Sequence, residues 1–164
     1  VKDNDDTTAL FMAAQEGHTD IVKALIAKGA QVDVKRTDGT TALIVAAQAG
    51  FLPIVKELLT TGANVNEKRN TGTTALFMAA QEGHADIVKA LIAKGADVNA
   101  KRNDGTTALM MSSYAGYYDI VEALLAKGAD VNVATSSGKT ALGAAKAGNH
   151  SKIIQLLKKA GARE

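Results

Sequence analysis

The sequence contains no cysteine and only one proline among 164 residues. The absence of cysteine excludes a disulfide scaffold, a thiolate metal site and a cysteine nucleophile, although it leaves the redox compartment open. Fifteen glycines with a single proline fit neither collagen nor a flexible linker. A content of 46% hydrophobic and 22% charged residues indicates a folded, globular chain.

Long apolar runs and a strong charge of one sign are also missing. No apolar stretch approaches the roughly 18–20 residues that span a bilayer, and residues 1–6 are acidic and polar rather than signal-like. The net charge of +2 is too small to indicate a nucleic acid or a membrane as partner. We therefore expect a soluble protein that binds neither; its compartment stays open, with the cytoplasm preferred.

One unit of 33 residues is repeated five times along the chain. The block Thr-Thr-Ala-Leu begins at Thr7, Thr40, Thr73 and Thr106, and Lys-Thr-Ala-Leu begins at Lys139. Residues 7–30 and 73–96 differ at one position, a trace that recent duplication or deliberate construction would leave. We expect one domain, divided into units one to five at residues 1–33, 34–66, 67–99, 100–132 and 133–164.

Each unit reads as two short helices followed by a projecting, hairpin-like loop. In unit three, Thr74 is placed to cap a first helix over about residues 75–82, and Gly83 suits the left-handed turn that ends it. Apolar residues at helical spacing predict a second helix with Asp86 in its first turn. Pro53 supports this start, because it replaces Asp86 in unit two and the first turn tolerates a missing amide.

Helices of this length are marginal alone in water, so each must bury its apolar side against the neighbouring unit. This predicts an all-α solenoid. The 33-residue period, with Thr-Ala-Leu-x-x-Ala-Ala, Gly-His, Ile-Val-x-x-Leu-Ile and Gly-Ala-Asp-Val-Asn in sequence, resembles the ankyrin repeat over the whole chain. The resemblance implies an L-shaped unit of helix, turn, helix and hairpin, and non-catalytic binding of a protein through the concave surface of hairpins and first helices.

The chain departs from the common Thr-Pro-Leu-His pattern of that family at two positions. Alanine replaces the proline in every unit, and the histidine is replaced by Phe11, Ile44, Phe77, Met110 and Gly143. The family's hydrogen bond from threonine to histidine therefore cannot form, and we expect apolar packing in its place.

The two ends of the array differ. Lys146, Lys158 and Lys159 replace apolar residues of unit one, so we expect unit five to be a polar cap at positions where interior units bury apolar groups. Unit one instead repeats the apolar residues of interior unit three at Leu10, Met12, Leu25 and Ile26. We therefore expect the outward side of unit one to expose apolar residues. Two explanations follow: preceding sequence is absent, or another copy of the chain covers this side by self-association.

No constellation of residues supports catalysis, a metal site or a cofactor. His18, His84 and His150 recur 66 residues apart, too far to share an ion when stacked helices lie roughly 8–10 Å apart, and we interpret them as structural turn residues. Residues 3–6 lack the later glycine and glutamate of a calcium loop. There is no nucleophile elbow and no glycine-rich phosphate loop, so we expect no enzyme.

Lys35-Arg36, Lys68-Arg69 and Lys101-Arg102 recur at the period of the unit and predict a basic row along the hairpins. The row is read either as solubilising charge beside acidic neighbours or as a site for an anionic protein surface. Nucleic acid is disfavoured, because no aromatic platform is interleaved with the row.

Unit four departs most from the shared pattern and holds all three tyrosines. Tyrosine is favoured at binding hot spots, and Tyr114 falls at a position predicted to be exposed, whereas Tyr117 and Tyr118 suit packing between helices equally well. Ser112 and Ser113 replace paired alanines, and their hydroxyls need partners such as the carbonyl one turn back. The candidate partner-binding residues are Arg36, Asp38, Gln48, Phe51, Arg69, Thr71, Gln81, Glu82, Arg102, Asn103, Asp104, Tyr114, Tyr117 and Tyr118.

Two other functions stay open at this stage. The near-copy units favour a structural or engineered scaffold without a physiological partner, while the irregular residues of units two and four argue against a simple consensus design. Alternatively, the chain is a regulatory fragment of a larger protein whose remaining sequence carries other activities.

Overall fold

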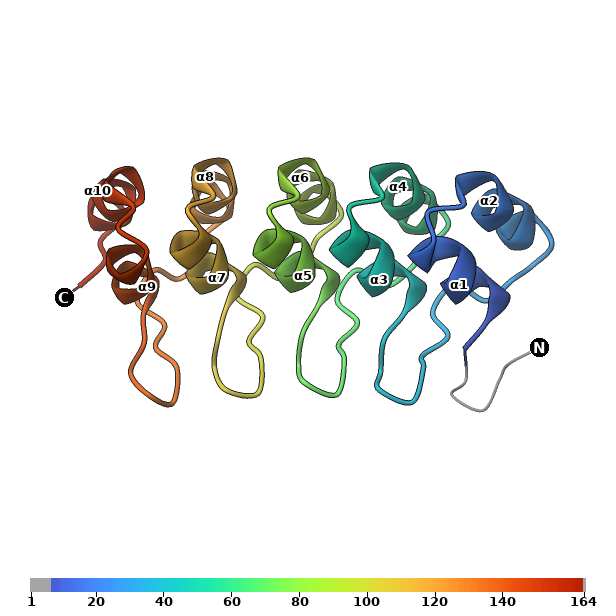
Figure 1. Ribbon diagram of the computed structural model, residues 1–164, viewed down its shortest axis with the longest axis horizontal. Coiled ribbons are helices and arrows are strands. Elements are labelled where there is room, and N and C mark those ends of the chain that lie inside the picture. Colours follow the sequence, from blue (N-terminus) through green and yellow to red (C-terminus); the bar gives the residue numbers. More distant parts are fainter. Residues whose placement is uncertain (1–6, 164) are drawn as a thin grey trace.

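The computed structural model describes residues 7–163, and this part of the chain folds into ten helices arranged as five pairs. The helices are α1 (Ala9–Gln15), α2 (Thr19–Ala27), α3 (Ala42–Ala49), α4 (Leu52–Thr60), α5 (Ala75–Glu82), α6 (Ala85–Ala93), α7 (Ala108–Ala115), α8 (Tyr118–Ala126), α9 (Ala141–Ala147) and α10 (Ser151–Lys159). Figure 1 shows the pairs in one row, with the second helices in one layer, the first helices in another and the loops projecting beyond the first helices. The predicted all-α solenoid is confirmed. Residues 3–6, considered above as a calcium loop, lie outside the described residues.

Local signals in the sequence set the limits of the helices. The first helix predicted for unit three is α5, and the side chain of Thr74 accepts a hydrogen bond from the Phe77 amide at 3.2 Å. Gly83 ends this helix in the left-handed conformation, at a φ of 82°. In unit five the same position is held by Asn149 at a φ of 58°, because asparagine is among the few residues that tolerate this conformation.

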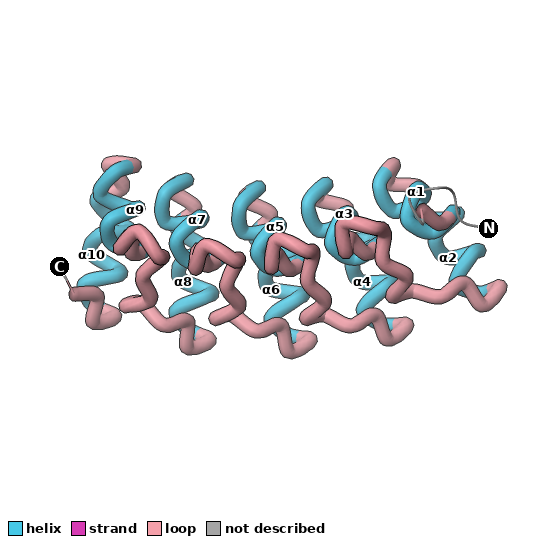
Figure 2. Tube along the Cα trace, turned by 90° about the horizontal axis from the view of Figure 1, so that it is seen from below, coloured by secondary structure: helices cyan, strands magenta, loops and turns pink. Residues whose placement is uncertain are grey.

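The loops between units resemble hairpins but contain little strand pairing. In the described residues, isolated antiparallel bridges join Lys101 to Thr107 and Ala134 to Thr140. Hydrogen bonds link neighbouring loops to each other: the Asn103 side-chain amide donates to the Asn70 carbonyl oxygen at 2.9 Å. The loops therefore form a regular row along one side of the molecule (Figure 2).

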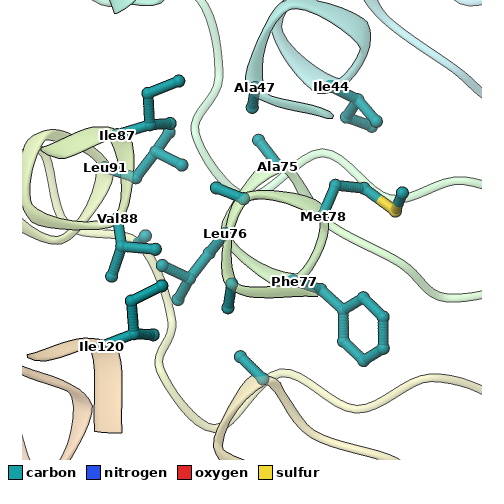
Figure 3. Packing of buried hydrophobic residues seen from close by; sticks show 14 of the residues in the cluster. Ile44, Ala47, Ala75, Leu76, Phe77, Met78, Ile87, Val88, Leu91 and Ile120 are labelled. Carbon is teal, nitrogen blue, oxygen red and sulfur yellow. The ribbon is translucent and has the colours of Figure 1, made fainter. Parts of the chain in front are cut away.

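The hydrophobic core runs along the row of units rather than around a centre. Leu76 of α5 points toward Val88 and Leu91 of α6, its partner within unit three (Figure 3). On the other side of α5, Ala75 lies beside Ala47 of unit two. Each interior unit thus buries apolar side chains against both neighbours, as expected for a solenoid.

A second contact between units recurs at the turn before each second helix. In units two to five, the ring at this position lies over the glycine that ends the first helix of the preceding unit. The pairs are Phe51 with Gly17, His84 with Gly50, Tyr117 with Gly83 and His150 with Gly116. Nε2 of His84 also lies 3.1 Å from the carbonyl oxygen of Gln48. This packing supports the interpretation of His84 and His150 as structural, whereas His18 of unit one is exposed.

The C-terminal unit carries charge where other units are apolar, with one correction. Lys146 is exposed, whereas Ala14, Ala47 and Ala80 at the same position are fully buried. Lys158 is exposed where the other units are buried or half-buried. The expectation for Lys159 was wrong, because its position is exposed in every unit and lies on the outer side of the second helix.

The outward side of unit one has exposed apolar residues, but of the four residues named from the sequence Met12 alone is exposed, while Leu25 and Ile26 are half-buried. Met12 is 57% exposed and Ile21 is 51% exposed. Ile87 holds in unit three the position that Ile21 holds in unit one, and it is 2% exposed. Leu10 was wrongly expected on this side: it is buried, because its side chain belongs to the core of the array. The exposed patch is therefore centred on Met12 and Ile21.

We expect this patch to cause concentration-dependent self-association, because it is chemically the same as the covered face of unit three. Light scattering from dilute to millimolar concentrations should show a rise in mean mass, and Ile21→Lys should abolish the rise by placing a charge in the patch. The control is Lys23→Glu, a charge change at an exposed residue of the same helix. A wild-type chain that stays monomeric throughout would contradict the expectation.

Of the two serines of α7, one meets the need for a partner and the other does not. The Ser112 hydroxyl donates to the Ala108 carbonyl oxygen at 2.9 Å, one turn back as predicted. The Ser113 hydroxyl is buried without a hydrogen-bond partner in the described structure, so the prediction fails there. We expect Ser113→Ala to raise the free energy of unfolding by about 1 kcal/mol, because a buried, unpaired hydroxyl is removed. Urea unfolding tests this, and Ser112→Ala, which removes a bonded hydroxyl, should give no gain.

Candidate functional site

Most of the candidate residues lie on one side of the array. We call it the hairpin-side surface and define it as the loop tips together with the exposed sides of the first helices. Gln48 and Glu82 line a polar groove of about 410 Å³ with Arg36 and Arg69. Phe51 lies elsewhere: its ring packs on Gly17 at the turn between helices. The surface therefore contains hollows at the junctions between units rather than one continuous floor.

The arginines of the basic row turn into these junctions. The guanidinium of Arg36 lies 5.2 Å from the centre of the Phe11 ring, and that of Arg102 lies 5.7 Å from the Phe77 ring. Nε of Arg69 donates to the hydroxyl of Thr40 at 2.8 Å. Arg36 and Arg102 thus cover a ring of the first helix of the preceding unit, and Arg69 is bonded to the loop just before that helix.

The lysines of the basic row differ in their surroundings: one forms an ion pair and two are exposed. Lys35 forms an ion pair with Glu67, and this hydrogen-bonded ammonium lowers the pKa of the Glu67 carboxyl. Lys68 and Lys101 are exposed. The row consequently presents less free positive charge than its sequence suggests, because Lys35 is paired with an acidic neighbour.

Acidic residues mark the loop tips. Hydrogen bonds from Thr106 hold the pKa of Asp104 below its usual value, with the Thr106 amide 2.9 Å from Oδ1. Partial burial alone would raise the pKa of Asp38, but hydrogen bonds from Thr40 and the charge of Arg69 lower it. Both carboxylates are thus held ionised at the tips, where they organise the turn.

Two further tip residues serve the contacts between and within loops. The Asn103 amide proton and side chain are both directed to the preceding loop, at the carbonyl oxygens of Thr71 and Asn70. The Thr71 hydroxyl lies 2.8 Å from that of Thr73. Their polar groups are therefore engaged within the array, which fixes the position of the tips.

The pattern of the junctions changes between units four and five. Here Thr135 replaces the arginine, Ala144 replaces the methionine of unit four and Ala147 replaces the glutamine of unit three. A groove of about 610 Å³ opens as a result, lined among others by Met110, Met111 and Tyr114, with Lys139 at its rim. It is mainly apolar and lies within the size range of ligand sites.

The three tyrosines do not form one patch. Tyr114 is 57% exposed and lines the groove between units four and five. Tyr118 is 38% exposed, but it lines a hollow with Lys152 and Leu156 of α10, on the side of the second helices. Tyr117 is half-buried against Gly83. Tyr117 and Tyr118 line one further hollow together, whereas Tyr114 lies apart from them in the groove between units four and five.

The structure repeats helix, turn, helix and loop five times, and each first helix starts at the segment Thr-Ala-Leu. A family model described as "Ankyrin repeats (3 copies)" matches residues 1–69 and 48–135. The chain belongs to the ankyrin-repeat family. Ankyrin repeats are generally protein–protein interaction modules and are typically non-catalytic. No curated protein matches the chain.

The apolar groove is the feature of this ankyrin-repeat chain that sequence reasoning missed. A signal was present, because Thr135, Ala144 and Ala147 each interrupt a pattern shared by earlier units. The cap predicted for unit five rests on Lys146, Lys158 and Lys159 and does not account for these three changes. None of the described helices is long and apolar enough to cross a lipid bilayer.

Proposed function

We propose that the chain binds a protein partner through its hairpin-side surface and that Tyr114 is the main anchor of this contact. The observation that carries the proposal is the large exposure of this aromatic side chain at the edge of an apolar groove. Aromatic residues beside well-packed pockets dominate the binding energy of many interfaces.

The rigidity of the array supports the same function. The tips are tied to each other by hydrogen bonds such as that from Asn103 to Asn70, and the arginines are held on the rings or hydroxyls of the preceding unit. A surface that is ordered before binding loses little conformational entropy when a partner docks.

We expect Tyr114→Ala to weaken partner binding by more than about 1 kcal/mol, a factor of roughly five or more in Kd, with little change in stability. The experiment captures binding proteins from a cell extract with the wild-type chain and then titrates the purified partner against each variant. Thermal unfolding confirms that the variant is folded.

Tyr118→Ala is the matched control, because it removes an exposed tyrosine from the side of the second helices. We expect its affinity to equal that of the wild type. Equal affinity of the Tyr114→Ala variant would contradict the assigned anchor, and a chain that captures no protein would favour a scaffold without a physiological partner.

A further inference from the structure

We propose that the groove between units four and five is a pocket for an aromatic side chain that lies next to a carboxylate in the partner. The proposal rests on the proposed function and deepens it, because it names the chemistry that the surface would recognise. It starts from a comparison of this junction with the equivalent junctions in the same chain.

At two other junctions, an arginine of the following unit lies over the ring at the start of the first helix, and the groove that remains beside Arg36 is smaller and polar. Arg36 covers Phe11, and Arg102 covers Phe77. At the junction of units four and five the corresponding residues are Thr135 and Met110; Thr135 has no guanidinium to lay over Met110, which is buried at the groove with 4% of its surface exposed. Among the four junctions, this is the one at which the arginine is replaced by a short side chain.

The second loss of volume comes from α9. Met78 of unit three is buried and faces Ile44 of unit two (Figure 3), and at the same position unit five has Ala144. The missing side chain would have faced Met110, which corresponds to Ile44. Both replacements lie in unit five, so the wall that this unit contributes to the groove is set back relative to the other junctions.

The lining favours an aromatic occupant. Met110, Met111 and Tyr114 supply two thioethers and one ring, and both groups make favourable contacts with aromatic rings. An aromatic side chain that enters the groove would lie against the thioethers and beside the ring of Tyr114. The volume of about 610 Å³ leaves room for such a side chain and for the adjoining backbone.

The charge at the rim favours a carboxylate beside that ring. Lys139 is the one charged residue that lines the groove, and it stands where units one to four have threonine. Its side chain is exposed, and no carboxylate of residues 7–163 forms an ion pair with it. An acidic group in the partner would complete this pair.

Methionine-methyl NMR offers a direct test with the full chain. The four methionines give four signals, of which Met110 and Met111 report on the groove, exposed Met12 reports on non-specific apolar binding and buried Met78 reports on the fold. The probe is 3-phenylpropionate, and the uncharged control is 3-phenylpropanamide. We expect saturable shifts of the Met110 and Met111 signals alone, and about threefold weaker binding of the amide.

Two variants make the test specific. Ala144→Leu refills the groove while the number of methionines stays at four, and we expect it to abolish the shifts in a chain at least as stable as the wild type. Lys139→Gln should leave the aromatic contact but make the acid and the amide bind equally.

The outcomes separate this proposal from the proposed function. Absent shifts, equal shifts at Met12, or equal binding of acid and amide to the wild type would overturn the pocket. None of these results involves the partner protein, so the assignment of Tyr114 as an anchor is decided independently by the partner titration.

Discussion

Replacing Ile87 with alanine is expected to lower the free energy of unfolding by about 2–5 kcal/mol, whereas the same replacement of Ile21 should lower it by about 1 kcal/mol or less. The two isoleucines occupy the same position of units three and one. Ile87 is buried against unit two, and Ile21 is half exposed because nothing in the described structure covers it. The difference therefore measures the contact with the preceding unit.

Urea unfolding followed by circular dichroism measures both losses, at protein concentrations below the onset of any self-association. Residues 7–30 and 73–96 differ at one position, so the two sites share their local sequence and their helix propensity. Equal losses at the two sites would contradict the assignment of stability to the interfaces between units.

Gly72→Ala is expected to lower the free energy of unfolding by about 3 kcal/mol or more, well beyond the cost of a left-handed alanine alone, which is about 1–2 kcal/mol. Gly72 has a φ of 83° at a loop tip. A Cβ atom there would lie 3.0 Å from the Lys101 carbonyl oxygen and 2.8 Å from Oδ1 of Asn103. The next loop would have to move away, and its hydrogen bonds would weaken.

Gly95→Ala is the control for this prediction. Gly95 also lies in a central part of the array and has a φ of 84°, but a Cβ atom there meets nothing within 4 Å. We expect this variant to show the conformational cost alone. Equal costs of the two substitutions, measured by urea unfolding, would show that the loops are not held in close contact.

Local structure could be read from the sequence because its causes are local. The bounds of α5, the cap at Thr74, the left-handed turn at Gly83 and the place of Pro53 in the first turn of α4 all depend on hydrogen bonds within a few residues. These expectations were confirmed. The repeat itself then predicted that the units stack.

The candidate site was harder to predict from the sequence, because its shape depends on contacts between units. The sequence makes the arginines of the basic row candidate partner-binding residues, but it does not indicate that Arg36 and Arg102 lie over rings one unit away. Tyr114 and Tyr118 are four residues apart in one chain segment but lie on different sides of the array. No local rule specifies which neighbour a long side chain will reach.

The sequence by itself determined the repeating unit, its helix ends and its turns, because a cap or a left-handed glycine acts through its immediate neighbours. Tertiary structure alone decided burial and the shape of the surface. Ile21 and Ile87 stand in nearly identical segments, and one is exposed while the other is buried. The groove at Tyr114 likewise exists because the short side chains of unit five do not fill the space beside unit four. Both depend on what packs against a residue, which lies outside its own segment.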